Sequence, residues 1–482
     1  MNITLHTRKY IIIILACSLW LLTGCEKYLE NTQLPAGTIA GKDAFTSDNA
    51  VSAIVTGSFF SLNNSGPFSG GGSSNIAYTT GLYSDELQNI STSAFAKAFY
   101  TNAINSSNIT HWTDLYSKIY VVNGAIEGIR NTPAMLYYKD QWLGESFFTR
   151  ALLYYYLVNL YGDVPLALTT DYTVNNQLSR APQSQVYQQI IADLKTAQGL
   201  LSSDYKDGYG SNTNARVRPN QAAATALLAK AYLYTQQWDS AEVQATSIIN
   251  NAAYELLTPD QVFLANSKET IWALATISDV KAYEYGLYNN GMPAELTPPK
   301  DPATAYSVLV AMSNFLLSAF EPNDTRFSNW VRSTTITASA TSPAVTYYFP
   351  NKYKSSVNGA EREVVLRLAD MYLVRAEARA RQNNISGAQA DLDAVRMRAG
   401  LPGTTAGNQP ALLTAIAKER QTELFTECGN RYFDLKRTGA IDGVMNVIAP
   451  QKGGSWSSYK QLWPIPPNDI ILNPHITPNP GY

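Results

Sequence analysis

Two helical hairpins, visible in the spacing of apolar and small residues, constrain the fold of this chain more than any other feature. Residues 219–236 and 238–250 both follow a helical period and meet at Gln236-Gln237-Trp238. Residues 363–381 and 385–399 repeat the arrangement around Gln382-Asn383-Asn384. The first hairpin places small and apolar residues at the spacing of a tetratricopeptide repeat: Leu228, Ala229, Tyr232, Ala241 and Ala245. Any antiparallel helix pair could give such a pattern once, but two pairs favour a repeat fold.

Further helices are expected on both sides of these hairpins. The same apolar period predicts helices over residues 43–62, 111–130, 139–161, 184–201 and 409–427. Gly162 and Pro165 follow the third of these, as a helix C-terminus requires. The sequence therefore predicts a mostly α fold, with tetratricopeptide-like helices around residues 111–250 and 363–440.

The region between about residues 254 and 362 has a different composition. A helical period occurs there only near 304–320, and the rest is rich in Asn, Thr, Ser, Pro and Tyr. Residues 283–288 and 333–348 are typical of loops and short strands. Residues 64–74 are also expected to form a loop. Because long irregular segments on a rigid scaffold often carry binding sites, we expect the ligand-binding half here.

The N-terminus predicts export and lipid attachment. Arg8 and Lys9 precede an apolar run over residues 10–22, which spans roughly 20 Å as a helix and is too short for a typical bilayer core. The run ends in Leu22-Thr23-Gly24-Cys25, which is typical of a bacterial lipobox, although an ordinary signal peptide with a chance cysteine is the alternative. We expect residues 1–24 to be removed, Cys25 to carry the lipid, residues 25–40 to form a tether and residues 41–482 a single domain.

Composition excludes several classes of protein. Without Arg8 and Lys9, 34 basic residues face 38 acidic ones, and this net charge of −4 offers no footprint for nucleic acid. After Cys25 only Cys428 remains, so we expect no disulfide. His111 and His475 lie far apart, and we expect no cofactor or metal site. Two acidic pairs could in principle hold calcium, but neither has the EF-hand spacing: Asp85-Glu86, and Asp391 with Asp393.

Acidic and basic residues crowd the helices after residue 140, and two interpretations compete. Paired carboxylates such as Glu419 and Glu423 could carry out acid–base chemistry, as in a glycosidase. Alternatively, these residues form ion pairs that lock the helices together, because neighbouring arginines lower carboxylate pKa values instead of raising one of them. We favour ion pairs and predict no catalytic residue. The residues concerned are Glu145, Arg150, Arg375, Glu377, Glu419, Arg420, Glu423, Arg431, Asp434, Lys436 and Arg437.

Several ordered segments resemble the SusD/RagB family of Bacteroidetes outer-membrane lipoproteins. Residues 145–166 (ESFFTRALLYYYLVNLYGDVPL) are similar to its signature helix. Four further segments match in order: residues 366–378 with 395–400, 419–427 with 431–439, 462–466 and 479–482. The lipobox also stands where that family has one. Cys428 departs from the family's common Trp, and Ser146 and Thr149 depart from its Ala and Leu, which puts local packing in doubt but not the resemblance.

The resemblance implies a function as well as a fold. Members lie on the outer face of the outer membrane, cap a TonB-dependent transporter of the SusC type, and deliver oligosaccharides or in some cases peptides to it. The implied fold has four tetratricopeptide-like pairs supporting an irregular ligand-binding half. We therefore expect a glycan-binding lipoprotein, not an enzyme. The alternatives are a peptide-binding member, a glycoside hydrolase and a purely structural adaptor.

Ligand residues must be sought in the loops, because the family's signature motifs do not carry them. A sugar ring stacks on an exposed aromatic ring while its hydroxyls bond to amide and charged groups. Aromatic residues in the irregular windows that stand near such groups are Phe68, Tyr78, Tyr83, Tyr283, Tyr285, Tyr288 and Trp330. A loop aromatic packed back onto the core is the alternative for each of them.

Overall fold

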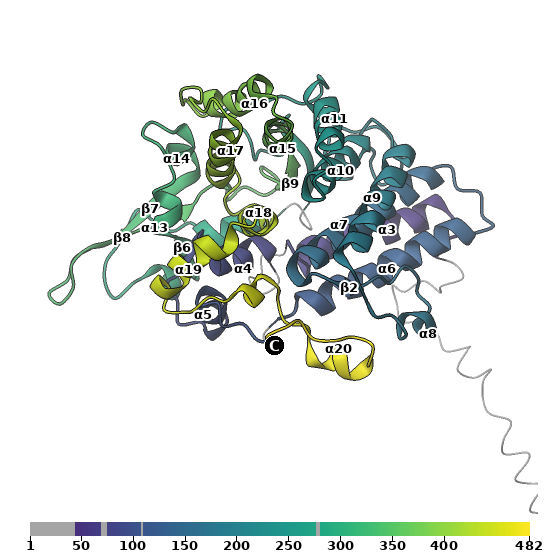
Figure 1. Ribbon diagram of the computed structural model, residues 1–482, viewed down its shortest axis with the longest axis horizontal. Helices are drawn as coiled ribbons and strands as arrows, with labels where there is room; N and C mark the ends of the chain where they lie inside the picture. The colour runs from purple at the N-terminus through teal and green to yellow at the C-terminus, as the bar shows by residue number, and fades with distance from the viewer. Residues whose placement is uncertain (1–43, 69–74, 108, 276–279) are drawn as a thin grey trace, which may run out of the picture.

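Stacked helix pairs form most of the molecule. The computed structural model describes residues 44–68, 75–107, 109–275 and 280–482, so Cys25 and the expected signal peptide and tether lie outside the described residues. The first array comprises α3 (Asp48–Asn64), α6 (His111–Asn131), α7 (Lys139–Tyr161), α9 (Gln183–Leu200), α10 (Gln221–Tyr234) and α11 (Trp238–Ile249). The second comprises α15 (Leu368–Arg381), α16 (Ile385–Arg398), α17 (Gln409–Glu423), α18 (Asn430–Arg437) and α19 (Ile441–Gln451). Since α11 packs on α15, the two arrays form one continuous arc (Figure 1).

The helix α7 lies at the centre of the first array. Almost all of its side chains are buried, because α6, α9 and α3 all pack against it. Gly144 lets α9 approach closely, since a Cβ there would lie 2.8 Å from Leu201 Cγ. The helix ends at Gly162, whose φ of +75° few other residues tolerate. The helices expected from the apolar period are confirmed for α6, α7 and α9–α11, because the apolar residues of each helix are buried in the core.

The region 254–362 is irregular, as expected, and is built from short elements. Its sheets pair β5 (Glu295–Leu296) with β7 (Val331–Ile336) in parallel and β7 with β8 (Val345–Pro350) antiparallel. The β7–β8 hairpin confirms the strands expected in 333–348 and extends to the left in Figure 1. The remaining elements are β4 (Thr270–Leu274), η2 (Tyr285–Asn289), α12 (Pro302–Tyr306), β6 (Val310–Met312), α13 (Asn314–Leu317) and α14 (Thr325–Trp330).

Three local expectations are wrong. The expected helix 304–320 is broken into α12, β6 and α13, because Ser307 adopts φ +57° and β6 pairs with β1 (Leu87–Asn89). The expected helix 363–381 starts only at Leu368, since β9 (Glu363–Arg367) pairs with β4. Residues 285–289 form a π-helix instead of a loop or strand. In each case a partner distant in sequence, or a single left-handed residue, overrides the local pattern.

The C-terminal tail closes the gap between the two arrays. Trp463 N–H donates to Leu160 O at 2.9 Å, and the Asn479 side chain donates to Tyr161 O at 3.0 Å, which ties the tail to the end of α7. Shorter elements complete the described chain: α4 (Ile76–Tyr83), α5 (Ala94–Tyr100), β2 (Val164–Pro165), α8 (Tyr172–Asn175), β3 (Arg180–Ala181), η3 (Ser458–Gln461) and α20 (Pro467–Leu472). Within the described ranges no helix combines the length and apolarity needed to cross a bilayer.

Candidate functional site

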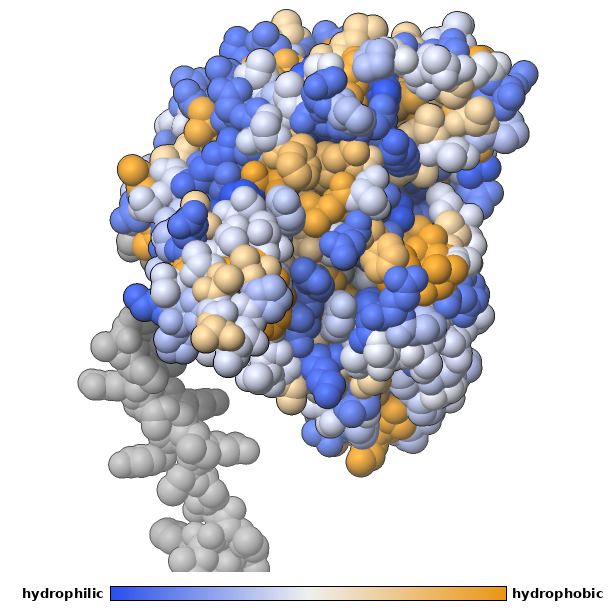
Figure 2. Space-filling model, turned by 90° about the vertical axis from the view of Figure 1, so that its left-hand side faces the viewer, coloured by the Kyte–Doolittle hydropathy of each residue, from blue (hydrophilic) through white to orange (hydrophobic). Residues whose placement is uncertain are grey.

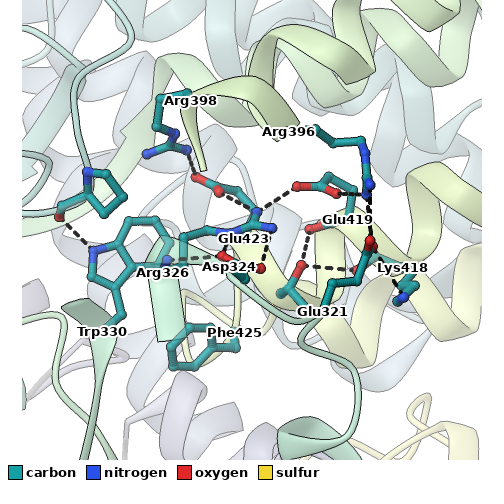
Figure 3. A network of polar contacts seen from close by, with 12 residues as sticks. Glu321, Asp324, Arg326, Trp330, Arg396, Arg398, Lys418, Glu419, Glu423 and Phe425 are labelled. Atoms are coloured by element: carbon teal, nitrogen blue, oxygen red, sulfur yellow. Dashed lines mark hydrogen bonds and ion pairs between the residues drawn. The ribbon is translucent and has the colours of Figure 1, made fainter. Parts of the chain in front are cut away.

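The charged motifs form a buried ion-pair network between the irregular region and α17. Arg326 in α14 donates to Glu419 Oε1 at 2.6 Å and to Glu423 Oε2 at 2.8 Å. It also holds Asp324 through two contacts of 2.8–2.9 Å, and all these side chains are at most 2% exposed (Figure 3). The guanidinium therefore joins Asp324, two residues away, to Glu419 and Glu423, which lie 93 and 97 residues away in the sequence.

A second arginine extends the network to the strands. Arg367, at the end of β9, contacts Glu269 at 2.9 Å, Glu423 at 2.5 Å and Glu427 at 2.7 Å. Lys352 donates to the carbonyl oxygens of Glu423 and Phe425. Both carboxylate oxygens of Glu423 therefore accept hydrogen bonds from arginines, Oε2 from Arg326 and Oε1 from Arg367. These contacts and those of Lys352 fix the segment after α17 against β9.

These acids are poorly placed for catalysis. Burial opposes ionisation of Glu423, but Arg398, Arg367 and Arg326 outweigh it and hold its pKa well below the usual range. The pKa values of Glu145 and Glu419 are raised, because burial outweighs their arginine partners there. The expected lowering by arginine is therefore wrong for these two. Both nevertheless remain ion-paired, to Arg218 and Arg326, so the ion-pair interpretation explains their positions.

The acidic pairs considered for calcium are occupied by protein groups. Asp85 pairs with Arg431 at 2.6 Å, and Asp391 pairs with Arg375 at 2.6 Å and Arg379 at 2.9 Å. Asp393 accepts the backbone N–H of Thr404. No group of three potential metal ligands occurs among the residues that the structure describes.

Cys428 packs against the core, which fits the interpretation of a small substitute for a larger residue. Its sulfur lies 3.9 Å from Val364 O, and burial raises the pKa of the thiol well above its usual range. The thiol therefore stays protonated and offers no nucleophile.

Six of the seven aromatic candidates are buried, which corrects the premise that these loop rings are exposed. Trp330 is fully buried, donates to Pro259 O at 2.7 Å and lies under Lys352. Tyr83 is fully buried and donates to Lys460 O at 3.0 Å. The other four are at most 7% exposed: Phe68, Tyr78, Tyr285 and Tyr288. A ring packed on both faces has no surface for a sugar in this conformation, because loop composition does not reveal which way a ring points.

Tyr283 is the candidate that reaches solvent, and it lines an open hollow of about 450 Å³, here called the η2 hollow. Its hydroxyl lies 3.4 Å from Asn64 Oδ1. The structure places the buried Tyr78 in the wall of the same hollow, whereas the other five aromatic candidates do not line it. The lining residues are Tyr78, Val280, Lys281, Ala282, Tyr283, Gly286, Leu287, Asn290, Ser307 and Leu309.

The η2 hollow combines an aromatic ring, apolar walls and polar groups at its mouth. Lys281 Nζ lies 4.5 Å from the centroid of the Tyr285 ring. Asn290 adopts a left-handed φ of +46° and donates to Tyr306 O at 2.7 Å, which fixes its carboxamide at the mouth. Ser307 is exposed beside it. Sugar hydroxyls need such hydroxyl, amide and ammonium partners next to an aromatic face.

Three buried carboxyls with raised pKa values, those of Glu86, Glu284 and Glu363, lie close to the η2 segment. Glu363 accepts the backbone N–H of Glu284 at 3.1 Å, just behind Tyr283. Burial raises the pKa of Glu363 to about 7 and, with nearby Asp85, that of Glu86 to about 8. Burial, followed by the repulsion of Glu363, raises the pKa of Glu284 as well. The carboxyls of Glu363 and Glu86 are therefore largely protonated in mildly acidic solution.

Sequence reasoning missed most of the wall. Lys281, Leu287, Ser307 and Leu309 come from either side of α12 and meet only because η2 and the 306–309 turn fold together. Local composition does not indicate which residues distant in the sequence become neighbours in the folded chain. The amides around Tyr288 were the one hint, and of these Asn290 lines the hollow.

A second hollow of about 510 Å³ lies over the α13–α14 segment. Phe320 and Phe327 line it with their ring centroids 5.5 Å apart. Figure 2 views the side that carries α14 and the β7–β8 hairpin, where apolar residues gather in patches between hydrophilic rims. The charged residues that line this second hollow, Glu321 and Asp324, are already ion-paired with Arg396 and Arg326. The η2 hollow therefore has the better set of available polar partners.

Comparisons with known proteins cover almost the whole chain. A family model described as "Starch-binding associating with outer membrane" matches residues 64–233, and the model of the SusD family matches residues 183–482. The SusD-like protein P2 of Formosa agariphila is 26% identical, over 96% of this chain and 97% of that protein.

Solved structures agree with the observed architecture. A laminarin-binding SusD-like protein has a TM-score of 0.71 and 26% identity, covering 90% of this chain and 99% of its own. A SusD superfamily protein from Bacteroides vulgatus has a TM-score of 0.73 at 20% identity, with the same coverage, and shows the fold alone. These matches confirm the mostly helical prediction.

Proposed function

Because the chain belongs to the SusD family, we propose that it captures an oligosaccharide in the η2 hollow and delivers it to a SusC-like TonB-dependent transporter. The observation that carries this proposal is the half-exposed Tyr283 ring beside Asn290, Ser307 and Lys281 in one hollow. The similarity to a laminarin-binding protein supports a glycan as the ligand.

The shape of the hollow favours weak, reversible capture. An open hollow buries only part of a ligand, so the affinity depends on a few stacking and hydrogen-bonding contacts. Reversible binding suits a protein that passes its ligand on. Catalysis finds no support in the network of Figure 3, where the motif acids Glu419 and Glu423 are both held by arginines.

Anchoring is the second part of the proposal. The lipobox at Cys25 would place a lipid 19 residues before Ala44, where the described chain begins. Several acyl chains on one cysteine would give stable attachment. We propose that the protein lies on the outer face of the outer membrane.

Isothermal titration with glycan and peptide panels tests the ligand. The full chain should bind at least one oligosaccharide saturably, with laminarin fragments as the first to try, and no peptide. If the chain bound only peptides, the glycan proposal would be wrong and the protein would be a peptide-binding member of the family. Prolonged incubation should leave the oligosaccharide intact, and the appearance of shorter products would contradict a purely binding role.

Affinity purification from detergent-solubilised outer membranes tests the partner. A tag at the C-terminus should recover a large TonB-dependent barrel together with this chain. A Cys25→Ala variant should lose its membrane attachment in the same preparation. Recovery of the chain without any barrel would contradict the transporter part of the proposal and leave glycan binding unaffected.

A further inference from the structure

Helix α18 carries two adjacent cations with different surroundings. Arg437 is bound on both sides, to Glu377 at 2.7 Å and to Asp434 at 2.8 Å. Lys436 Nζ donates to Asn159 O, near the end of α7, and lies 5.4 Å from the centroid of the Tyr432 ring. Within the described part of the chain no carboxylate pairs with Lys436. Its ammonium therefore lacks the counter-charge that its neighbour has.

Other buried lysines show what satisfied ammonium groups look like here. Lys230 pairs with Asp370 at 2.8 Å, and Lys118 and Lys352 likewise pair with acids. Among the described residues Lys452 has no ion-pair partner, but it donates to two carbonyl oxygens, of Leu82 at 2.6 Å and Ser84 at 2.8 Å, and Asp85 lies nearby. An ammonium has three N–H donors. Lys436 uses one of them on the protein, which leaves two.

Lys436 lines a hollow of about 390 Å³ between α7, α9, α18 and the C-terminal tail. Besides Lys436 and the ion-paired Arg437, its lining consists of neutral groups, among them Asn159, Gln183, Tyr187, Ser458, Tyr459 and Gln461. Gln183 and Tyr459 are exposed at the mouth. A partly desolvated cation next to amides and hydroxyls is the arrangement that binds an oxyanion, because the anion supplies the missing charge.

We propose that this hollow, here called the Lys436 hollow, binds a small oxyanion with Lys436 as its charge partner. The shared chemistry is a carboxylate or sulfate group, either carried by an acidic sugar or present as a free ion. A volume of about 390 Å³ is within the usual range for small-ligand pockets. The site is separate from the η2 hollow, with which it has no lining residue in common.

The charged and titratable groups around the hollow identify Lys436 as the one that changes charge near neutrality. Arg437 is held by its two acids, and burial raises the pKa of Tyr187 and Tyr234 above their usual range. Tyr459 lies at the mouth. Just outside, Asp163 accepts the Gln183 backbone N–H, and Asp442 accepts Ser458 and Gln461. Burial lowers the pKa of Lys436 to about 7.

Titration calorimetry with sodium sulfate and sodium glucuronate, at ionic strength fixed with sodium chloride, tests the site. Both probes keep their charge between pH 6 and 9, and glucose is the neutral control. The full chain should bind saturably at pH 6 and about tenfold or more weakly at pH 9, since Lys436 loses its proton. Tighter binding of glucuronate assigns the anion to a sugar, and equal binding of sulfate assigns it to a free ion.

Two variants separate binding from folding. Lys436→Met should weaken sulfate and glucuronate at least tenfold at pH 6. Lys195→Met removes an exposed cation from α9, one of the helices that border the hollow, and should bind as the parent does. If Lys436→Met does not fold, the comparison of pH 6 with pH 9 on the unaltered chain still decides. Equal binding at both pH values, equal binding by the variants, or no saturable binding would show that Lys436 only caps α7, and would overturn the proposal.

Discussion

The helical arrays and the irregular region are stabilised by different interactions. In the arrays, neighbouring helices bury apolar faces that repeat along the sequence. Some of their ion pairs, such as Arg375 with Asp391, are close in the chain, and others, such as Lys230 with Asp370, join the two arrays. The irregular region is fixed to α17 by Arg326, whose partners Glu419 and Glu423 are 93 and 97 residues away. A local apolar period thus builds the scaffold, whereas a few long-range charges position the half that carries the η2 hollow.

The largest difference between the two regions should appear when the Arg326 guanidinium is removed, because the irregular region should then lose more stability than the helical arrays. Arg326→Met leaves Asp324, Glu419 and Glu423 buried without one of their partners, and breaking a buried ion pair costs about 3–5 kcal/mol. Hydrogen exchange should speed up in α14 and β7 while α10 and α11 keep their protection. Glu255→Gln, at a surface pair with both side chains about 60% exposed, is the control and should change stability by less than about 1 kcal/mol. Uniform loss of protection would mean that the network supports both regions equally.

A cavity in the first array should have the opposite effect, with hydrogen exchange becoming faster in the array and not in the irregular region. Leu228 in α10 is fully buried, so Leu228→Ala should lower the free energy of unfolding by about 3 kcal/mol. Faster exchange should appear in α9, α10 and α11. Val243→Ala on α11, where the side chain is 63% exposed, should have little effect. If β7 and β8 lose protection before α9 does, the two regions are not independent in the way proposed.

Glu86, whose carbonyl oxygen accepts the Ser313 N–H of the irregular region, should make stability respond to pH. The pKa of Glu86 is raised to about 8 in the folded chain, so from its unfolded value of 4.5 upward the folded state binds the extra proton. Stability contributed by this proton is present at low pH and is lost as pH rises toward 8. The loss should be about 2 kcal/mol between pH 6 and 8, at about 1.4 kcal/mol per pH unit.

A Glu86→Gln variant isolates this contribution. The amide cannot ionise, so the melting temperature of the variant should fall less between pH 6 and 8 than that of the parent. Glu255→Gln should keep the parental slope because that side chain is exposed. Parallel slopes for all three proteins would mean that Glu86 is ionised throughout this range.

The sequence predicted the arrays well because their information is local. The bounds of α6, α7, α9 and α11 follow from the apolar period and from stops such as Gly162. Residues 363–367 and 304–320 were misassigned because strand pairing with β4 and β1 decides their conformation. Strand partners so far away leave no mark on the local period.

The proposed binding site was less predictable than the fold. Its region and Tyr283 were indicated by composition, but the same criterion also selected Trp330 and Tyr83, which are core residues. Whether a loop aromatic faces solvent depends on contacts such as Trp330 with Pro259 that lie 71 residues apart. Lys281 and Ser307 gave no local signal at all, since they become neighbours only in the folded hollow.

Glycan titration of two tyrosine variants tests the central claim most directly. Tyr283 lies in the η2 hollow, whereas Tyr120, 57% exposed on α6, is a tyrosine of the helical scaffold. Tyr283→Ala should weaken oligosaccharide binding about tenfold, which corresponds to about 1.4 kcal/mol, with an unchanged melting temperature. Tyr120→Ala should bind as the parent does. Loss of binding in Tyr120→Ala, with full binding in Tyr283→Ala, would place the ligand on the helical scaffold and contradict the account.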